Sequence, residues 1–176
     1  LRQDRCVPAP ALFDPEHYRR QLRWPRRESG LWAHFVRHGD AAGLDPSPYF
    51  STAWYKQTYP DWSASGARTA LEDFLDRWKF GQERRTHPLL DPTEYRWFNP
   101  DVPLDAATVL HFSRHGDAEG RRPSVAFDPD RYRSSRPDLT EPAFRHHAQA
   151  QGKAGPAPQH GRRDPREIAA LAHSVL

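Results

Sequence analysis

One phrase recurs four times in the chain, and this repetition constrains the fold more than any other feature of the sequence. The copies begin at residues 12, 49, 89 and 126, so their starts are 37, 40 and 37 residues apart. A proline-containing phrase follows each of them. A third phrase closes the copy and reads His-Phe-x-x-His-Gly in its strongest form, at residues 34–39 and 111–116. Three phrases in a fixed order predict a tandem repeat.

The first phrase of each copy has the features of a helix N-terminus. Asp14 is a suitable N-cap residue, and Pro15 follows at the first helical position, where its missing N–H costs nothing. Phe13 and Tyr18 flank this cap at the spacing of a hydrophobic staple. The other copies place the same pair at Phe50 and Tyr55, Leu90 and Tyr95, and Phe127 and Tyr132. Because a residue before proline disfavours the helical conformation, each first helix should end before the next proline. The predicted ends are Arg23, Thr58, Phe98 and Ser135.

A second helix with a larger apolar stripe is predicted in each copy. In the third copy, Asp105 is placed to cap a segment that carries Val109 and Phe112. In the first three copies the corresponding segments end at glycines, and the glycine of the third copy is predicted to be a left-handed C-cap. These glycines are Gly39, Gly81 and Gly116. The fold class is therefore predicted to be all-α, with about four two-helix units in a short solenoid-like array.

Proline and aromatic contents agree with this organisation. The chain has 176 residues, of which 18 are proline, and its hydrophobic content is only 36%. Spread evenly, so many prolines would prevent long helices. Many of them instead mark helix starts and the connectors between copies. The aromatic content of 12% favours a folded core over disorder.

The repeats divide the chain into predicted segments. A disordered or extended start covers residues 1–11, and the helical repeat array covers residues 12–158. A linker and a terminal capping helix that begins at Asp164 occupy residues 159–176. The absence of Met predicts a piece of a longer protein. The units of the array are residues 12–48, 49–88, 89–124 and 125–158.

Composition excludes several classes of protein. Cys6 is the only cysteine, so an internal disulfide and a cysteine-based metal cage are impossible. The longest apolar runs are far shorter than the roughly 18 residues that a membrane-spanning helix needs. A net charge of +3, spread along the chain, lacks the basic stripe of a nucleic-acid-binding protein. No membrane span and no nucleic-acid partner are therefore expected.

The complete pattern resembles a known kind of repeat. Written as F-D-P-x-x-Y, P-D and H-F-x-x-H-G-x-x-E-G-R-x-P-S, it is similar to tandem repeats that flank catalytic domains in bacterial cell-surface polysaccharide glycosyltransferases. The resemblance covers roughly residues 12–158, and residues 111–121 match best. The second copy departs from it, with Ser51 for the capping aspartate and with Asp76 and Phe80 at the two histidine positions. The resemblance implies an accessory module without an activity of its own.

Two histidine pairs have the spacing of zinc ligands. His34 and His38, like His111 and His115, lie four residues apart, which places both imidazoles of a pair on one helix face. No glutamate lies between them as in the H-E-x-x-H zinc motif. Because both pairs occupy the same phase of the repeat, we favour capping or hydrogen bonding between helices over metal binding. No cofactor is expected.

Aromatic and arginine side chains allow two interpretations. The repeated tyrosines, with Trp24, Trp54, Trp62 and Trp97, form either a sugar-stacking surface or, more commonly at helical spacing, part of the core. The arginine pairs either contact phosphate groups or form a solvated face with the neighbouring acidic residues. The candidate contact residues for a partner or a glycan are Trp62, Trp97, Arg84, Arg85, Arg121 and Arg122.

These observations predict a non-catalytic interaction or spacer module whose partner is a protein or an adjacent domain of the same polypeptide. The resemblance places it in bacterial surface-polysaccharide synthesis, in the cytoplasm or at the periphery of the inner membrane. A glycan- or polyanion-binding domain is one alternative, and a glycosyltransferase fragment is another. Burial of Trp62 and Trp97 would argue against glycan binding. Their clustering with the arginine pairs on one exposed concave face would favour it.

Overall fold

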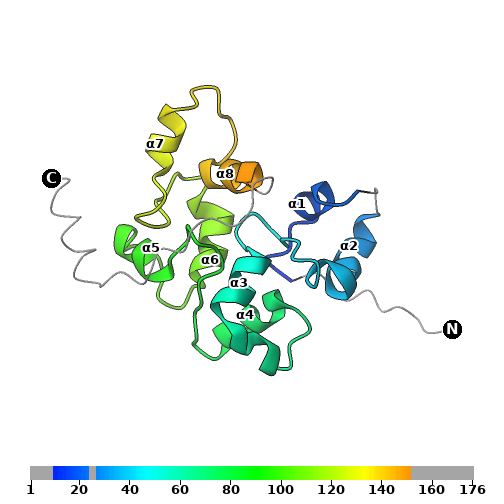
Figure 1. Cartoon of the computed structure of the whole chain (residues 1–176). Coiled ribbons are helices and arrows are strands. Elements are labelled where there is room, and N and C mark those ends of the chain that lie inside the picture. Colours follow the sequence, from blue (N-terminus) through cyan, green and yellow to red (C-terminus); the bar gives the residue numbers. More distant parts are fainter. Residues whose placement is uncertain (1–9, 24–26, 152–176) are drawn as a thin grey trace.

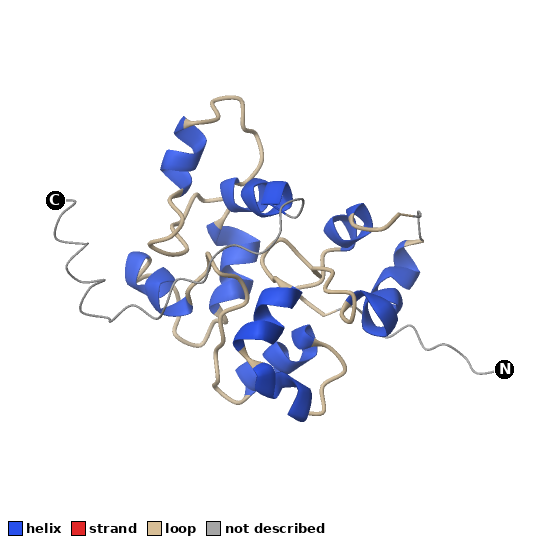
Figure 2. Ribbon diagram, in the orientation of Figure 1, coloured by secondary structure: helices blue, strands red, loops and turns tan. Residues whose placement is uncertain are grey.

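The computed structural model describes residues 10–23 and 27–151, and within these residues the chain is helical and contains no strand (Figure 2). The predicted all-α class is confirmed for this part of the chain. Predictions on residues 1–9, on Trp24 and on residues 152–176, which include the terminal helix, lie outside the described residues.

Four short helices begin where the capping phrases predict them. The side chain of Asp14 accepts a hydrogen bond from the backbone N–H of His17 at 2.9 Å. Asp91 and Asp128 cap two further helices in the same way. The predicted N-caps are thus confirmed at three of the four helices. The four are α1 (Pro15–Arg20), α3 (Thr52–Thr58), α5 (Pro92–Phe98) and α7 (Pro129–Ser134).

The remaining helix of this set, α3, is capped from outside its own phrase. The side chain of Ser51 makes no capping hydrogen bond. The carboxylate of Asp45 accepts instead from the N–H of Thr52 at 2.7 Å. The acceptor therefore comes from the connector that precedes the helix.

A second helix follows each of these four, and two of them end in a π-helical turn. The helices are α2 (Leu31–His34), α4 (Ala70–Lys79), α6 (Thr108–His111) and α8 (Ala143–Gln151). The π-helical turns are η2 (Phe35–Gly39) after α2 and η4 (Phe112–Gly116) after α6. Two 3₁₀ turns, η1 (Glu28–Gly30) and η3 (Pro60–Ala64), lie between first and second helices.

The predicted left-handed cap at Gly116 is wrong. Positive φ occurs at Gly81, at 76°, whereas in the first and third copies it occurs four residues after the closing glycine, at Gly43 and Gly120. Gly39 and Gly116 are required for a different reason. A Cβ atom at either position would overlap the hydroxyl of a buried tyrosine.

The predicted cap at Asp105 is also wrong. Helix α6 begins at Thr108, and its first N–H donates to the carboxylate of Glu83. Glu83 follows the preceding helix α4 in the chain. The sequence pattern could not locate this helix start because its acceptor comes from the preceding helix pair.

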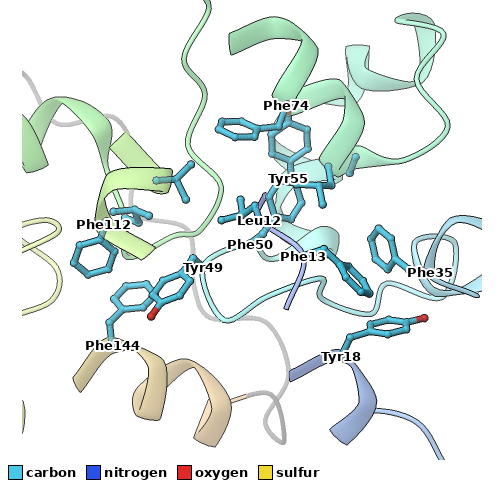
Figure 3. Close-up of a cluster of buried hydrophobic side chains, with 14 of the residues drawn as sticks. Leu12, Phe13, Tyr18, Phe35, Tyr49, Phe50, Tyr55, Phe74, Phe112 and Phe144 are labelled. Carbon is cyan, nitrogen blue, oxygen red and sulfur yellow. The ribbon is translucent and has the colours of Figure 1, made fainter. Parts of the chain in front are cut away.

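Aromatic side chains form the core (Figure 3). The staple rings contact one another as predicted, with centroids 5.4 Å apart for Phe13 and Tyr18. Tyr49 lies where three helix pairs meet. Its ring stacks on Phe144 at 5.7 Å and meets Phe112 edge-on at 5.8 Å.

The first and last helix pairs also contact each other. The carboxylate of Asp14, at the start of α1, forms an ion pair with Arg145 of α8. Arg20 of α1 donates to the side-chain amide of Gln149 at 3.2 Å. Figure 1 shows α8 lying between α7 and the α1–α2 pair. These contacts join the two ends of the helical region into one block.

Candidate interaction surface

A tyrosine of the first helix is hydrogen-bonded to the second helix in every pair. The Tyr18 hydroxyl lies 2.7 Å from His34 Nδ1, and the Tyr95 hydroxyl lies 2.9 Å from His111 Nδ1. Burial raises the pKa of Tyr95 and lowers that of His111. The tyrosine therefore keeps its proton, and the neutral imidazole accepts it in a hydrogen bond.

The second pair replaces this histidine with an aspartate. The Tyr55 hydroxyl donates to Asp73 Oδ2 at 2.7 Å. The prediction that Asp76 stands at the first histidine position is therefore wrong, because Asp73 is three residues earlier. The sequence pattern misplaced the residue equivalent to His34 and His111. The reason is that α4 continues as a regular α-helix, whereas α2 and α6 are followed by π-helical turns.

The fourth pair keeps the histidine but changes its neighbour. Tyr132 lies 2.7 Å from His146 Nδ1. His147 then contacts Phe127 and Tyr132, the contacts that Phe35 makes in the first pair. His146 therefore gives the register of the fourth pair, which the sequence phrases left degenerate.

The second member of each histidine pair stacks on the first. Ring centroids are 5.3 Å apart for His34 and His38 and 5.6 Å apart for His111 and His115. Among the described residues, no group of three or more His, Cys, Asp or Glu side chains is placed to hold a metal ion.

The arginines proposed as contact residues in the second copy bind carboxylates of the chain itself. Arg84 pairs with Asp61 at 2.5 Å and with Asp73 at 3.4 Å, and it covers the ring of Tyr59. Arg85 pairs with Asp91 at 3.4 Å and donates to a backbone carbonyl. Both arginine side chains are largely buried, and their ion pairs connect neighbouring elements of the fold.

The arginines of the third copy are engaged in the same manner. Arg121 pairs with Asp101 at 2.7 Å and with Glu119 at 2.5 Å, and its pKa is raised by these partners. Arg122 covers the ring of Phe98 at 4.6 Å and lies 3.8 Å from Asp128. An external phosphate would have to compete with these carboxylates.

The candidate tryptophans differ in exposure. Trp62 is half-buried and carries the ammonium group of Lys56 over its ring at 4.5 Å. Trp97 is 43% exposed and contacts Phe98. No contact joins these two tryptophans among the described residues. Sequence reasoning did not single out the most exposed apolar side chains, Phe80 at 83% and Leu104 at 89%.

Buried carboxylates that sequence reasoning missed join successive pairs. Asp40, directly after η2, accepts from the N–H of Ala70 at the start of α4, at 2.9 Å. Asp117, directly after η4, accepts from the N–H groups of Phe144 and Arg145 at the start of α8. Glu83 plays the same part at α6. The only sequence signal is an acidic residue one or two positions after the closing glycine.

Backbone hydrogen bonds form a second joint at each connector. In the first three pairs, the N–H of the N-cap residue of the first helix donates to a carbonyl of the connector that leads into the next pair. The bonds run from Asp14 to Pro46 at 2.8 Å, from Ser51 to Thr86 at 2.8 Å and from Asp91 to Pro123 at 3.3 Å. Each junction therefore has a carboxylate bond and a backbone bond.

Burial shifts the pKa values of ionisable groups near these joints. Burial raises the pKa of Asp45 to about 7. Burial also lowers the pKa of His17 to about 4 and that of His87 to about 3. Both imidazoles are therefore neutral in the folded protein near neutral pH.

None of the described helices has the length and apolar character required to cross a membrane. Comparison with known protein families, with curated proteins and with solved structures finds no match to this chain.

Proposed function

We propose that the helices form a tandem array of four pairs that acts as a non-catalytic interaction or spacer module. The recurrent junction carries this proposal. At three successive positions an acidic side chain caps the second helix of the following pair, and an N-cap N–H binds the following connector. A repeated joint of this kind fixes each pair relative to the next.

The burial of the joints supports a rigid spacer. Asp40 is 4% exposed and Asp117 is 2% exposed. Separating the two partners of such a buried hydrogen bond leaves an unpaired carboxylate in the interior, which is strongly destabilising. The joints therefore resist bending. The Asp14–Arg145 ion pair further ties the first helix to the last.

The proposed setting is bacterial surface-polysaccharide synthesis, where the resembling repeats flank glycosyltransferase domains. The partner would be a protein or an adjacent domain of the same polypeptide, on the cytoplasmic side of the inner membrane. Phe80 and Leu104 are exposed apolar side chains that such a partner would cover.

Replacement by a flexible linker tests the spacer role. In the full-length protein, residues 12–158 are exchanged for a Gly-Ser linker with the same number of residues. We expect surface polysaccharide to be lost while sugar transfer by the remaining protein persists. A control exchanges only residues 63–66, which are all exposed. Normal polysaccharide after the complete exchange would refute the proposal.

Glycan or polyanion binding is the second candidate, and the exposed ring of Trp97 is the observation in its favour. The ion pairs of the four candidate arginines weigh against it. Titration with heparin and with a neutral polysaccharide, followed by tryptophan fluorescence, separates the two functions. Saturable binding that is lost in Trp97→Ala would establish the second candidate.

A further inference from the structure

A groove of about 590 Å³ lies beside the fourth helix pair, between α7, α8 and the two connectors nearest to them. Its lining includes Ala126 and Asp128 from the connector, Arg131 from α7, Ser135 directly after α7, and Gln151 at the end of α8. The groove therefore follows the side of the pair on which the next connector would lie.

In the first three pairs the corresponding place is filled by the following connector. The N–H of the third N-cap residue, Asp91, donates to the Pro123 carbonyl. Asp128 is the N-cap residue of α7, and its N–H has no acceptor within residues 10–23 and 27–151. The fourth pair thus has an N-cap N–H available, the same group that binds a connector carbonyl in the first three pairs.

A second bond of the connectors points to the same place. Thr86 Oγ1 donates to the Tyr49 carbonyl at 2.7 Å, and Ser124 Oγ donates to the Leu89 carbonyl at 2.7 Å. Tyr49 and Leu89 lie two residues before their N-caps. The residue two positions before Asp128 is Ala126, which lines the groove.

The tyrosine-bonded histidines indicate which residues would form a connector after the fourth helix pair. Pro46 lies twelve residues after His34, and Pro123 lies twelve residues after His111. The residue twelve positions after His146 is Pro158. A glycine precedes each proline by three positions, at Gly43, Gly120 and Gly155.

We propose that residues 155–158 of this chain occupy the groove as a fourth connector. The Pro158 carbonyl then accepts from the N–H of Asp128, and Ala157 lies over Ser135. The second placement follows from the third pair, where Arg122, one residue before Pro123, covers Phe98, the counterpart of Ser135. The assignment rests on the proposed array of helix pairs, because that array supplies the register.

Disulfide trapping in the full-length chain tests the proposal. In a Cys6→Ser background, Ser135→Cys is combined with Ala157→Cys. The matched control combines Ala157→Cys with Ser134→Cys, which is exposed on the neighbouring position of α7. Under mild oxidation in native buffer, the 135/157 pair should form an intramolecular disulfide at least about tenfold faster than the control. Both pairs should react equally fast in concentrated guanidinium chloride.

Two outcomes would overturn the proposal. Equal rates in native buffer would mean that residues 155–158 do not lie in the groove. A disulfide between two molecules would mean that a second copy fills it. Neither outcome depends on the polysaccharide experiment, so this inference and the proposed function fail separately.

Hydrogen exchange provides a second measurement, and it uses the wild-type chain without any substitution. The Asp128 amide should be protected about tenfold or more, like the Asp91 amide, whose acceptor is known. Exchange of Asp128 at the rate of an unfolded chain, with Asp91 protected, would refute the proposal.

Discussion

The second helix pair differs from the first and third in how it satisfies a buried tyrosine hydroxyl. Tyr18 and Tyr95 lie beside histidine imidazoles, whereas Tyr55 donates to the carboxylate of Asp73. That carboxylate also binds Arg77 at 3.0 Å. A buried hydroxyl needs an acceptor, but the fold accepts either a neutral or a charged one.

The choice of acceptor accompanies a change of helix geometry. Five residues after the tyrosine-bonded side chain, the first and third pairs have Gly39 and Gly116, where the hydroxyl leaves no room for a Cβ atom. Trp78 stands at this position in the second pair, within the regular helix α4. In the first and third pairs a π-helical turn and a glycine occur together with histidine, and in the second a regular helix occurs with aspartate. The fourth pair combines a histidine, His146, with the regular helix α8.

The largest effect is expected from Asp73→Ala. The change leaves the Tyr55 hydroxyl and two arginines without their shared buried acceptor. We expect a loss of about 3 to 5 kcal/mol in the free energy of unfolding, measured by urea denaturation. Asp76→Ala is the control, because Asp76 is exposed and, within the described part of the chain, pairs only with Lys79. Similar losses in the two variants would remove the contrast between the pairs.

Gly116→Ala tests the geometric half of the comparison. The added Cβ atom would overlap the Tyr95 hydroxyl, so the π-helical turn or the tyrosine must move. We expect a loss of up to about 3 kcal/mol in thermal or urea unfolding. Gly30→Ala serves as the control, because a Cβ atom added there would have no neighbouring atom within 4 Å. Unchanged stability of Gly116→Ala would show that the glycine is not required.

Asp45→Asn probes the connector between the first and second pairs. The carboxyl pKa is 3.8 in the unfolded chain but about 7 in the folded one, because burial disfavours the charge. Between these values the folded state retains a proton that the unfolded state has released, so stability falls as pH rises. The variant should therefore be more stable by about 1 to 2 kcal/mol at pH 8 and gain little at pH 4. The same gain at both pH values would contradict this assignment.

The smallest effect is expected from His111→Asn, which removes the neutral acceptor of the third pair. Loss of the hydrogen bond should cost about 1 kcal/mol above pH 7. Burial lowers the pKa of His111 below its ordinary value of 6.5, so the unfolded chain takes up a proton before the folded one does. The contribution of the neutral imidazole to the free energy of unfolding is therefore lost as the pH falls below 6.5. The difference between wild type and variant should shrink over that range in urea titrations, whereas a constant difference would mean that the imidazole titrates normally.

The starts of the first helices could be predicted because their signals are local. Asp14 caps an amide three residues away, and Phe13 contacts Tyr18 five residues away. The functional candidates were less predictable. Arg84 and Arg121 are as basic as any phosphate-binding arginine, but each has an acidic partner far away in the sequence, 23 residues from Arg84 and 20 residues from Arg121. Only the fold shows that these charges are already engaged.

The sequence by itself determined three N-caps, the staples and the all-helical class of the described residues, since these depend on neighbouring residues. Tertiary structure decided which side chain accepts from each tyrosine, which glycines are needed and what joins the pairs. Asp40 and Ala70 are 30 residues apart, and their bond exists only when two helix pairs have docked. Burial then gives such bonds their strength, because water no longer competes for the carboxylate.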